Sequence, residues 1–136
     1  MQLRDNFGRQ IRKLRLSLTD RCNLRCHYCM PLDTQFMDKN NYLSFDEIHQ
    51  VLKELNAYGL EELRLTGGEP LLRQNFSYFL SLLGSLNFKK IGFTSNGILL
   101  DRYFSELKST GVNYLNISLD TLNKETFKKV THGDYF

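Results

Sequence analysis

The sequence has few cysteines and no long apolar run, and each scarcity excludes a class of protein. Only three of the 136 residues are cysteine, and all three lie between positions 22 and 29. An odd number packed so tightly argues against a disulfide framework, and no second pair exists to complete a usual zinc framework. No apolar run approaches the roughly 20 residues that cross a bilayer, so we expect no membrane span and no membrane partner.

The amino terminus carries no sign of a secretion signal. Its first residues, Met-Gln-Leu-Arg-Asp-Asn-Phe, lack the apolar core that such a segment needs. We therefore expect a cytoplasmic protein, and reducing surroundings of that kind suit thiolate ligands. A length of 136 residues with 41% hydrophobic content is typical of one globular domain.

Charge is small in total but unevenly placed. The net charge is +3, yet residues 1–25 alone carry seven basic and two acidic side chains, and the remainder has an acidic excess. A solvated basic arm is the simple interpretation, and a field that attracts a polyphosphate is the functional one. Nucleic acid is not expected as a partner, because no basic stripe alternates with exposed aromatic residues.

Cys22, Cys26 and Cys29 form a C-x3-C-x2-C motif, for which four interpretations remain. Three thiolates suit a cubic iron–sulfur cluster that leaves one iron without a protein ligand. A structural zinc site would need a fourth ligand, and His27 is awkwardly placed because it directly follows Cys26. A disulfide with one free thiol and a redox C-x-x-C pair each leave one cysteine unexplained.

Strand and helix patterns alternate along the chain. Short apolar strands are predicted at 15–18, 63–65, 91–94 and 114–119, and apolar residues at helical spacing predict helices after 44, over 75–86, over 100–107 and from 123 to 130. Ser44 and Glu47 match a capping box at the start of the first helix. This order predicts an α/β fold in which repeated strand–helix units form a parallel sheet, part of a TIM-type barrel.

Glycine-rich or polar stretches follow each predicted strand, where sites gather in parallel sheets. They are the cysteine motif, Gly67-Gly68-Glu69-Pro70, Thr94-Ser95-Asn96-Gly97 and Ser118-Leu119-Asp120. The two glycines let backbone approach a ligand closely, and Pro70 stiffens the exit of the turn. Taken alone, Gly-Gly is simply a strand-to-helix turn, but convergence on one rim predicts a single site.

The chain resembles the radical S-adenosylmethionine (radical SAM) superfamily in two of these motifs, C-x3-C-x2-C and Gly-Gly-Glu-Pro. Within it, the chain is similar to the GTP 3',8-cyclase family, which acts first in molybdenum-cofactor biosynthesis. The similarity lies in five stretches: 5–9, 17–31, 63–70, 94–97 and 116–120. It covers nearly all of this chain but only the amino-terminal part of the family's chain.

The resemblance implies a radical SAM lyase that converts GTP to (8S)-3',8-cyclo-7,8-dihydroguanosine 5'-triphosphate. The cysteines would hold a [4Fe–4S] cluster whose open iron chelates S-adenosylmethionine. The other implied site residues are Tyr28, Gly68 and Ser118 for S-adenosylmethionine, and Arg15, Arg64 and Thr94 for GTP. An electron-donor protein and a homodimeric state are further expectations. Arginine suits phosphate through its planar fork of donors, although each singleton also has a plain surface or strand-end interpretation.

The chain departs from that family in its length and in its cysteines. The family's chain continues through the barrel to three more cysteines for a second cluster, and none follows Cys29 here. We expect residues 1–136 to be an incomplete radical SAM core: a basic arm over 1–13, then half a barrel with an exposed edge strand. The alternatives are a peptide-modifying radical SAM enzyme, an inactive fragment, or a noncatalytic metal-binding module.

Overall fold

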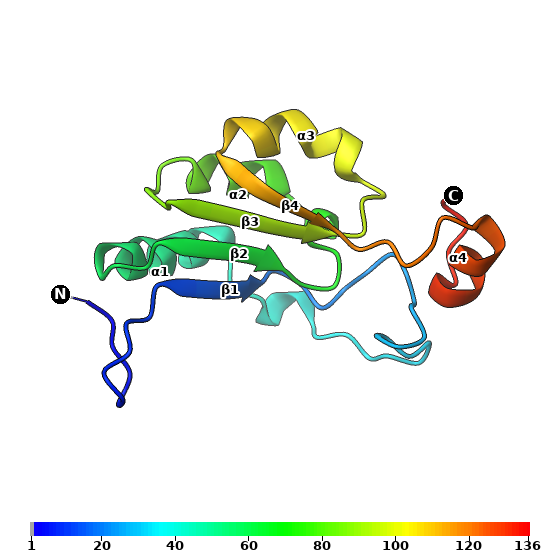
Figure 1. Ribbon diagram of the computed structural model, residues 1–136, viewed down its shortest axis with the longest axis horizontal. Helices are drawn as coiled ribbons and strands as arrows, with labels where there is room; N and C mark the ends of the chain where they lie inside the picture. The colour runs from blue at the N-terminus through cyan, green and yellow to red at the C-terminus, as the bar shows by residue number, and fades with distance from the viewer. Residues whose placement is uncertain (1) are drawn as a thin grey trace.

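The computed structural model describes residues 2–136, so Met1 of the predicted basic arm lies outside it. Four parallel strands alternate with four α-helices, in the sheet order β1-β2-β3-β4 (Figure 1). The elements are β1 (Lys13–Ser17), α1 (Phe45–Ala57), β2 (Glu62–Thr66), α2 (Phe76–Leu83), β3 (Lys90–Ser95), α3 (Leu100–Ser109), β4 (Val112–Ile117) and α4 (Lys124–Thr131), with short 3-10 helices η1 (Lys39–Asn41) and η2 (Pro70–Leu72). The predicted α/β fold of strand–helix units is confirmed.

Helix boundaries follow the local chemistry of the sequence. Ser44 caps α1: its hydroxyl accepts from the Glu47 amide at 3.2 Å, and its own amide donates to the Glu47 carboxylate at 2.7 Å. This is the predicted capping box. Asn123 caps α4 by accepting from the Thr126 amide at 2.9 Å. No helix within residues 2–136 is both long and apolar enough to span a bilayer.

The hydrophobic core lies between the sheet and helices α1, α2 and α3, which cover one face of the sheet (Figure 1). Leu63 and Leu65 of β2 and Phe93 of β3 are buried on that face. Aromatic rings join the helices to the sheet: Phe76 of α2 packs 5.7 Å from Phe93 and 5.4 Å from Tyr103 of α3, between ring centroids. The burial of these apolar side chains away from water is the main contribution to the stability of a domain this small.

The opposite face of the sheet is polar, and no helix of residues 2–136 covers it (Figure 1). Alternation along the strands places Arg15 and Arg64 side by side, because they pair in register between β1 and β2. Arg64 in turn pairs with Gly92 of β3. All four strands run in the same direction, so their carboxyl ends lie at one end of the sheet. The cysteine segment and α4 lie at that end (Figure 1).

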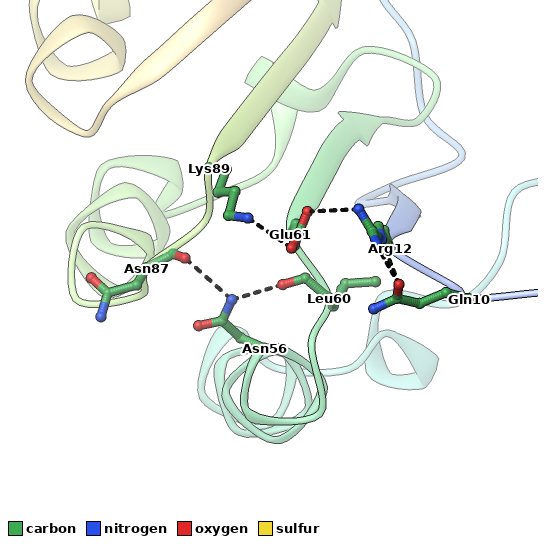
Figure 2. A network of polar contacts seen from close by, with 7 residues as sticks. All are labelled: Gln10, Arg12, Asn56, Leu60, Glu61, Asn87 and Lys89. Atoms are coloured by element: carbon green, nitrogen blue, oxygen red, sulfur yellow. Dashed lines mark hydrogen bonds and ion pairs between the residues drawn. The ribbon is translucent and has the colours of Figure 1, made fainter. Parts of the chain in front are cut away.

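A polar network fixes the other end of the sheet, at the amino ends of the strands (Figure 2). Glu61 pairs with Lys89 at 2.8 Å between Nζ and Oε1, while its backbone amide donates to the Arg12 carbonyl. The Asn56 side-chain amide donates to the Leu60 and Asn87 carbonyls at 2.8 and 3.3 Å. These bonds align β1, β2 and β3 far from the cysteines.

Two sequence expectations need correction. Helix α2 ends at Leu83 rather than 86, because Gly84 caps it. The apolar residues at helical spacing within 100–107 and after 44 do not all lie in the core. Phe104 of α3 is 55% exposed, and Val51 and Tyr58 of α1 are 51% and 41% exposed. Each lies on the flank of its apolar stripe, away from the sheet, since a helix on the outside of a sheet buries only the middle of that stripe.

Candidate metal and cofactor site

The three cysteines lie on one irregular loop that leaves β1 and stays attached to the end of β2. The Leu18 amide donates to the Thr66 carbonyl at 2.9 Å, and the Cys29 amide donates to the Cys26 carbonyl at 2.9 Å, which closes a tight turn. All three thiols are free; Cys22 and Cys26 are half-buried and Cys29 is exposed. All three cysteines follow β1 on this one loop, at the carboxyl end of the sheet.

Burial of the thiols disfavours their charged form. Desolvation is the main cause that raises the pKa of both Cys22 and Cys26, and the neighbouring thiols Cys22 and Cys29 add to the rise at Cys26. A cysteine binds metal as the thiolate, so the charge of bound iron would replace the lost solvation.

The donor set fits a cluster better than a single ion. Within residues 2–136, no three His, Cys, Asp or Glu side chains are grouped closely enough to hold one metal ion. Three thiolates leave one iron of a cubic cluster without a protein ligand, whereas a structural zinc site needs a fourth ligand. His27, the proposed fourth zinc ligand, places Nδ1 3.3 Å from the Val130 carbonyl instead.

The Gly-Gly-Glu-Pro turn is packed directly on the segment that leads into the cysteines. The Gly68 amide donates to the Thr19 carbonyl at 2.6 Å and the Glu69 amide to the Arg21 carbonyl at 2.7 Å. A Cβ on Gly68 would lie 2.3 Å from the Arg21 carbonyl oxygen, which leaves no room for any side chain. Glycine is therefore required here for close backbone approach, whether or not a ligand binds.

Hydrogen bonds of Tyr28 and Ser118 join the segment after β4 to two other parts of the molecule. Tyr28 joins it to the cysteine loop, and Ser118 joins it to the end of β3. The Tyr28 hydroxyl donates to the Asp120 carboxylate at 2.7 Å, and this bond is the main reason that its pKa is raised. The Ser118 amide donates to the Ser95 carbonyl at 2.9 Å, so Ser118 lies just past the strand end. Both side chains are exposed at the rim.

Arg15, Arg64 and Thr94 lie along the polar face of the sheet rather than on its rim. Neither arginine forms an ion pair within residues 2–136. Gly92 is buried beside Arg64, and a Cβ there would lie 3.5 Å from the arginine Nε, an ordinary van der Waals contact. Thr94 follows Gly92 by two residues on the same face.

A cleft with a volume of about 540 Å³ lies away from the cysteines. Its lining includes Arg21, Tyr42, Phe45 and Arg73, and none of the cysteines. A smaller hollow of about 80 Å³ borders Arg64 and Gly92 on the polar face.

A family model described as the radical SAM superfamily matches residues 16–136. The chain belongs to that superfamily. Radical SAM proteins use a [4Fe–4S] cluster and S-adenosylmethionine, and the three free thiols on one loop are a suitable ligand set for such a cluster.

Several curated relatives are named GTP 3',8-cyclase, two of them from Synechocystis sp. and Geobacter sulfurreducens. The one from Synechocystis sp. is 57% identical over 94% of this chain, and the one from Geobacter sulfurreducens is 43% identical over 96%. This chain covers 39% and 41% of their lengths. It therefore spans about two fifths of the curated relatives that it matches.

A solved structure shares the radical SAM fold of this chain. Streptococcus suis SuiB bound to S-adenosylmethionine superposes with a TM-score of 0.71 at 19% identity, over 90% of this chain and 28% of that one. At this identity the likeness shows the fold alone, and it agrees with the predicted part of a TIM-type barrel.

The sequence analysis gave no individual role to Glu69, Ser95 or Asn96, which are joined by hydrogen bonds at the ends of β2 and β3. The Glu69 side chain is fully buried and accepts from the Ser95 hydroxyl at 3.0 Å and the Asn96 amide at 2.8 Å. The signal was a charged residue inside a turn between apolar elements. Helix α4 was predicted, but its contact with the cysteine loop was not. The Arg25 amide donates to the Thr131 carbonyl at 2.8 Å, so the end of α4 holds the loop in place.

Proposed function

We propose that this chain is the radical SAM core of a GTP 3',8-cyclase, which makes the cyclic nucleotide of the first step of molybdenum-cofactor biosynthesis. The observation that carries the proposal is the pair Arg15 and Arg64, which form no ion pair within residues 2–136 and lie on the sheet face that leads to the cysteine loop. The similarity to two proteins named GTP 3',8-cyclase supports it.

Cys22, Cys26 and Cys29 would hold the cluster. When bound, the cluster and S-adenosylmethionine supply one-electron chemistry that starts hydrogen abstraction from the substrate ribose. The protein's own part is to hold three thiolates on a loop that is fastened on both sides, by the Gly-Gly-Glu-Pro turn and by the end of α4. Such fastening fixes the geometry before substrate arrives.

Tyr28, Gly68 and Ser118 would bind S-adenosylmethionine. Tyr28 is proposed to contact the adenosine part, with Asp120 holding its hydroxyl. The Gly68 amide already donates to Thr19, so its contact to the methionine amino group would use the carbonyl oxygen. Ser118 lies at the end of β4 with its hydroxyl exposed.

Arg15, Arg64 and Thr94 would contact GTP. Two guanidinium groups side by side suit a polyphosphate, because each can donate two parallel hydrogen bonds. The nearby cations Lys13 and Lys90 already have local partners: Lys13 pairs with Glu62 at 2.9 Å, and Lys90 lies 3.7 Å from the Tyr114 ring centroid. The two arginines are therefore the free cations of this face within residues 2–136.

Residues 1–136 would be one incomplete domain in this proposal, and further GTP contacts would come from outside it. An electron-donor protein is a required partner, because the reaction begins with one electron. A homodimeric state is part of the same proposal.

The proposal is tested by anaerobic reconstitution with iron and sulfide. We expect about four irons per chain and a change in the absorption spectrum when S-adenosylmethionine is added. Cys26→Ser should lose most of the iron, whereas Ser17→Ala, on the strand before the loop, should retain it. Full iron loading of Cys26→Ser, or zinc in place of iron, would contradict the proposal.

The GTP site is tested separately by calorimetry. Arg64→Ala should weaken GTP binding by about 10- to 100-fold, the value of a charge-assisted hydrogen bond. Arg12→Ala is the matched control, since Arg12 lies at the opposite end of the sheet (Figure 2). Equal affinity in both variants would leave a radical SAM core whose substrate is not GTP.

A further inference from the structure

The side chain of Asn96 lies between the end of β3 and the cysteine loop. Its amide nitrogen Nδ2 is 2.8 Å from Asn23 Oδ1 and 3.7 Å from Cys22 Sγ. A sulfur atom accepts hydrogen bonds at longer distances than oxygen does, so the second contact is a hydrogen bond to a cluster ligand. The Leu24 backbone amide donates to the same sulfur at 3.4 Å, and Asn96 supplies the side-chain N–H that reaches a cysteine sulfur within residues 2–136.

The orientation of this amide is fixed by its other atoms. Asn96 Oδ1 accepts from the Ile98 amide at 3.1 Å, so the NH₂ group must face the opposite way, toward the cysteine loop. A rotated amide would lose the Ile98 bond and would bring two oxygens together at Asn23.

The backbone of Asn96 is anchored by a buried carboxylate. Its amide donates to Glu69 Oε2 at 2.8 Å, and the Ser95 hydroxyl donates to Glu69 Oε1 at 3.0 Å. Since Glu69 is fully buried, these bonds are shielded from water and hold the end of β3 in place. Asn96 is thus presented to Cys22 on a rigid support.

We propose that Asn96 is a positioning residue that raises the reduction potential of the cluster through its hydrogen bond to the Cys22 sulfur. The inference rests on the proposed function, because it needs the cluster on Cys22. A donor at a ligand sulfur stabilises the added negative charge of the reduced cluster more than the oxidised one, and hydrogen bonds to the sulfurs are among the features that set such potentials.

Two substitutions remove the donor in different ways. Asn96→Ser is neutral, keeps an oxygen for the Ile98 amide and is too short to reach Cys22. Asn96→Asp keeps the same shape and the Oδ1 acceptor but replaces the NH₂ with an oxygen. We expect Asn96→Ser to lower the equilibrium constant for one-electron reduction about tenfold, which is 59 mV for one electron, and Asn96→Asp to lower it further.

The measurement is an anaerobic redox titration of the reconstituted full chain, followed by electron paramagnetic resonance, with the iron content of every sample. Asn56→Ser is the control, because it removes two structural amide bonds at the far end of the sheet and should leave the potential unchanged (Figure 2). Asn23→Asp is the charge control: it adds a negative charge beside Cys22 but keeps the Asn96 donor, so its shift should be smaller than that of Asn96→Asp.

The outcomes separate the two proposals. If the unmodified chain takes up no iron, the proposed function fails and this inference fails with it. If the chain and Asn96→Ser both load iron and share one potential, only the tuning role of Asn96 is overturned. Loss of iron from both Asn96 variants in folded protein would also overturn tuning, in favour of a role in cluster assembly.

Discussion

At the residue scale, Gly68 carries the tightest steric requirement of the site. A methyl group there would meet the Arg21 carbonyl oxygen at 2.3 Å, and that oxygen also accepts from the Glu69 amide, so neither backbone segment can move freely. We expect Gly68→Ala to lower the free energy of unfolding by about 1–3 kcal/mol, measured by urea denaturation.

Gly84 provides the matched control for that substitution. It has φ −60° at the end of α2, and a Cβ there would make only ordinary contacts from 3.5 Å. Gly84→Ala should be neutral or stabilise by about 0.4–1 kcal/mol, because alanine restricts the unfolded chain more than glycine does. Similar losses in the two variants would mean that the turn is not held against the cysteine segment.

Glu69 is the second residue whose chemistry is set by burial. Desolvation raises the pKa of its carboxyl, against the opposing effect of its hydrogen bonds to Asn96, Leu71 and Ser95. Glu69→Gln would turn an NH₂ toward one of these donors and leave buried polar groups unpaired. We expect a loss of about 1–3 kcal/mol of unfolding free energy. The comparison is Glu62→Gln, a surface ion-pair partner of Lys13, which should cost less than about 1 kcal/mol.

At the scale of the elements, the start of α1 gives a pH-dependent contribution to stability. The backbone amide and then the hydroxyl of Ser44 hold the pKa of Glu47 below its ordinary value of 4.5. The stability that the ionised Glu47 carboxylate contributes is therefore fully present above its ordinary pKa. This stability is lost as the pH falls through the lower pKa of the folded state. Glu47→Gln should destabilise the protein at pH 7 and make little difference at pH 2, as measured by chemical denaturation at both values.

Glu54 is the control within the same helix. Its side chain is exposed and forms no ion pair within residues 2–136. Glu54→Gln should therefore show a smaller difference between the two pH values. A pH effect in Glu54→Gln as large as that in Glu47→Gln would assign the effect to general charge on the helix rather than to the capping box.

The elements also show which parts of the fold the sequence could predict. Capping at Ser44 and the order of strands and helices depend on residues close together in the chain, and they were predicted correctly. The Glu69–Asn96–Cys22 contacts join three strand ends, so they depend on tertiary packing that no local pattern encodes. The left-handed conformation of Asn75, φ 59°, at the start of α2 was missed for a related reason, because asparagine adopts it only in some contexts.

At the scale of the whole molecule, the sheet has two unlike edges. Strand β1 exposes two charged side chains and a serine, Lys13, Arg15 and Ser17. Strand β4 exposes three large apolar side chains, Tyr114, Leu115 and Ile117, each 42% exposed or more, together with Asn113 and Asn116. No further strand pairs with β4 within residues 2–136. An apolar edge with free backbone donors and acceptors favours pairing with another chain, while a charged edge resists it.

This asymmetry predicts that the 136-residue chain self-associates through β4. Leu115→Lys should lower the average mass seen in sedimentation velocity, because a lysine on an edge strand must lose solvation when two edges pair. Leu122→Lys tests whether the added charge alone is responsible. Leu122 is 80% exposed and lies beyond the end of β4, outside the strand that would pair with another chain. If both variants reduce association equally, the effect is solubility. If only Leu115→Lys does, β4 is the contact, and in a longer chain the same edge would be the place for the next parallel strand to add.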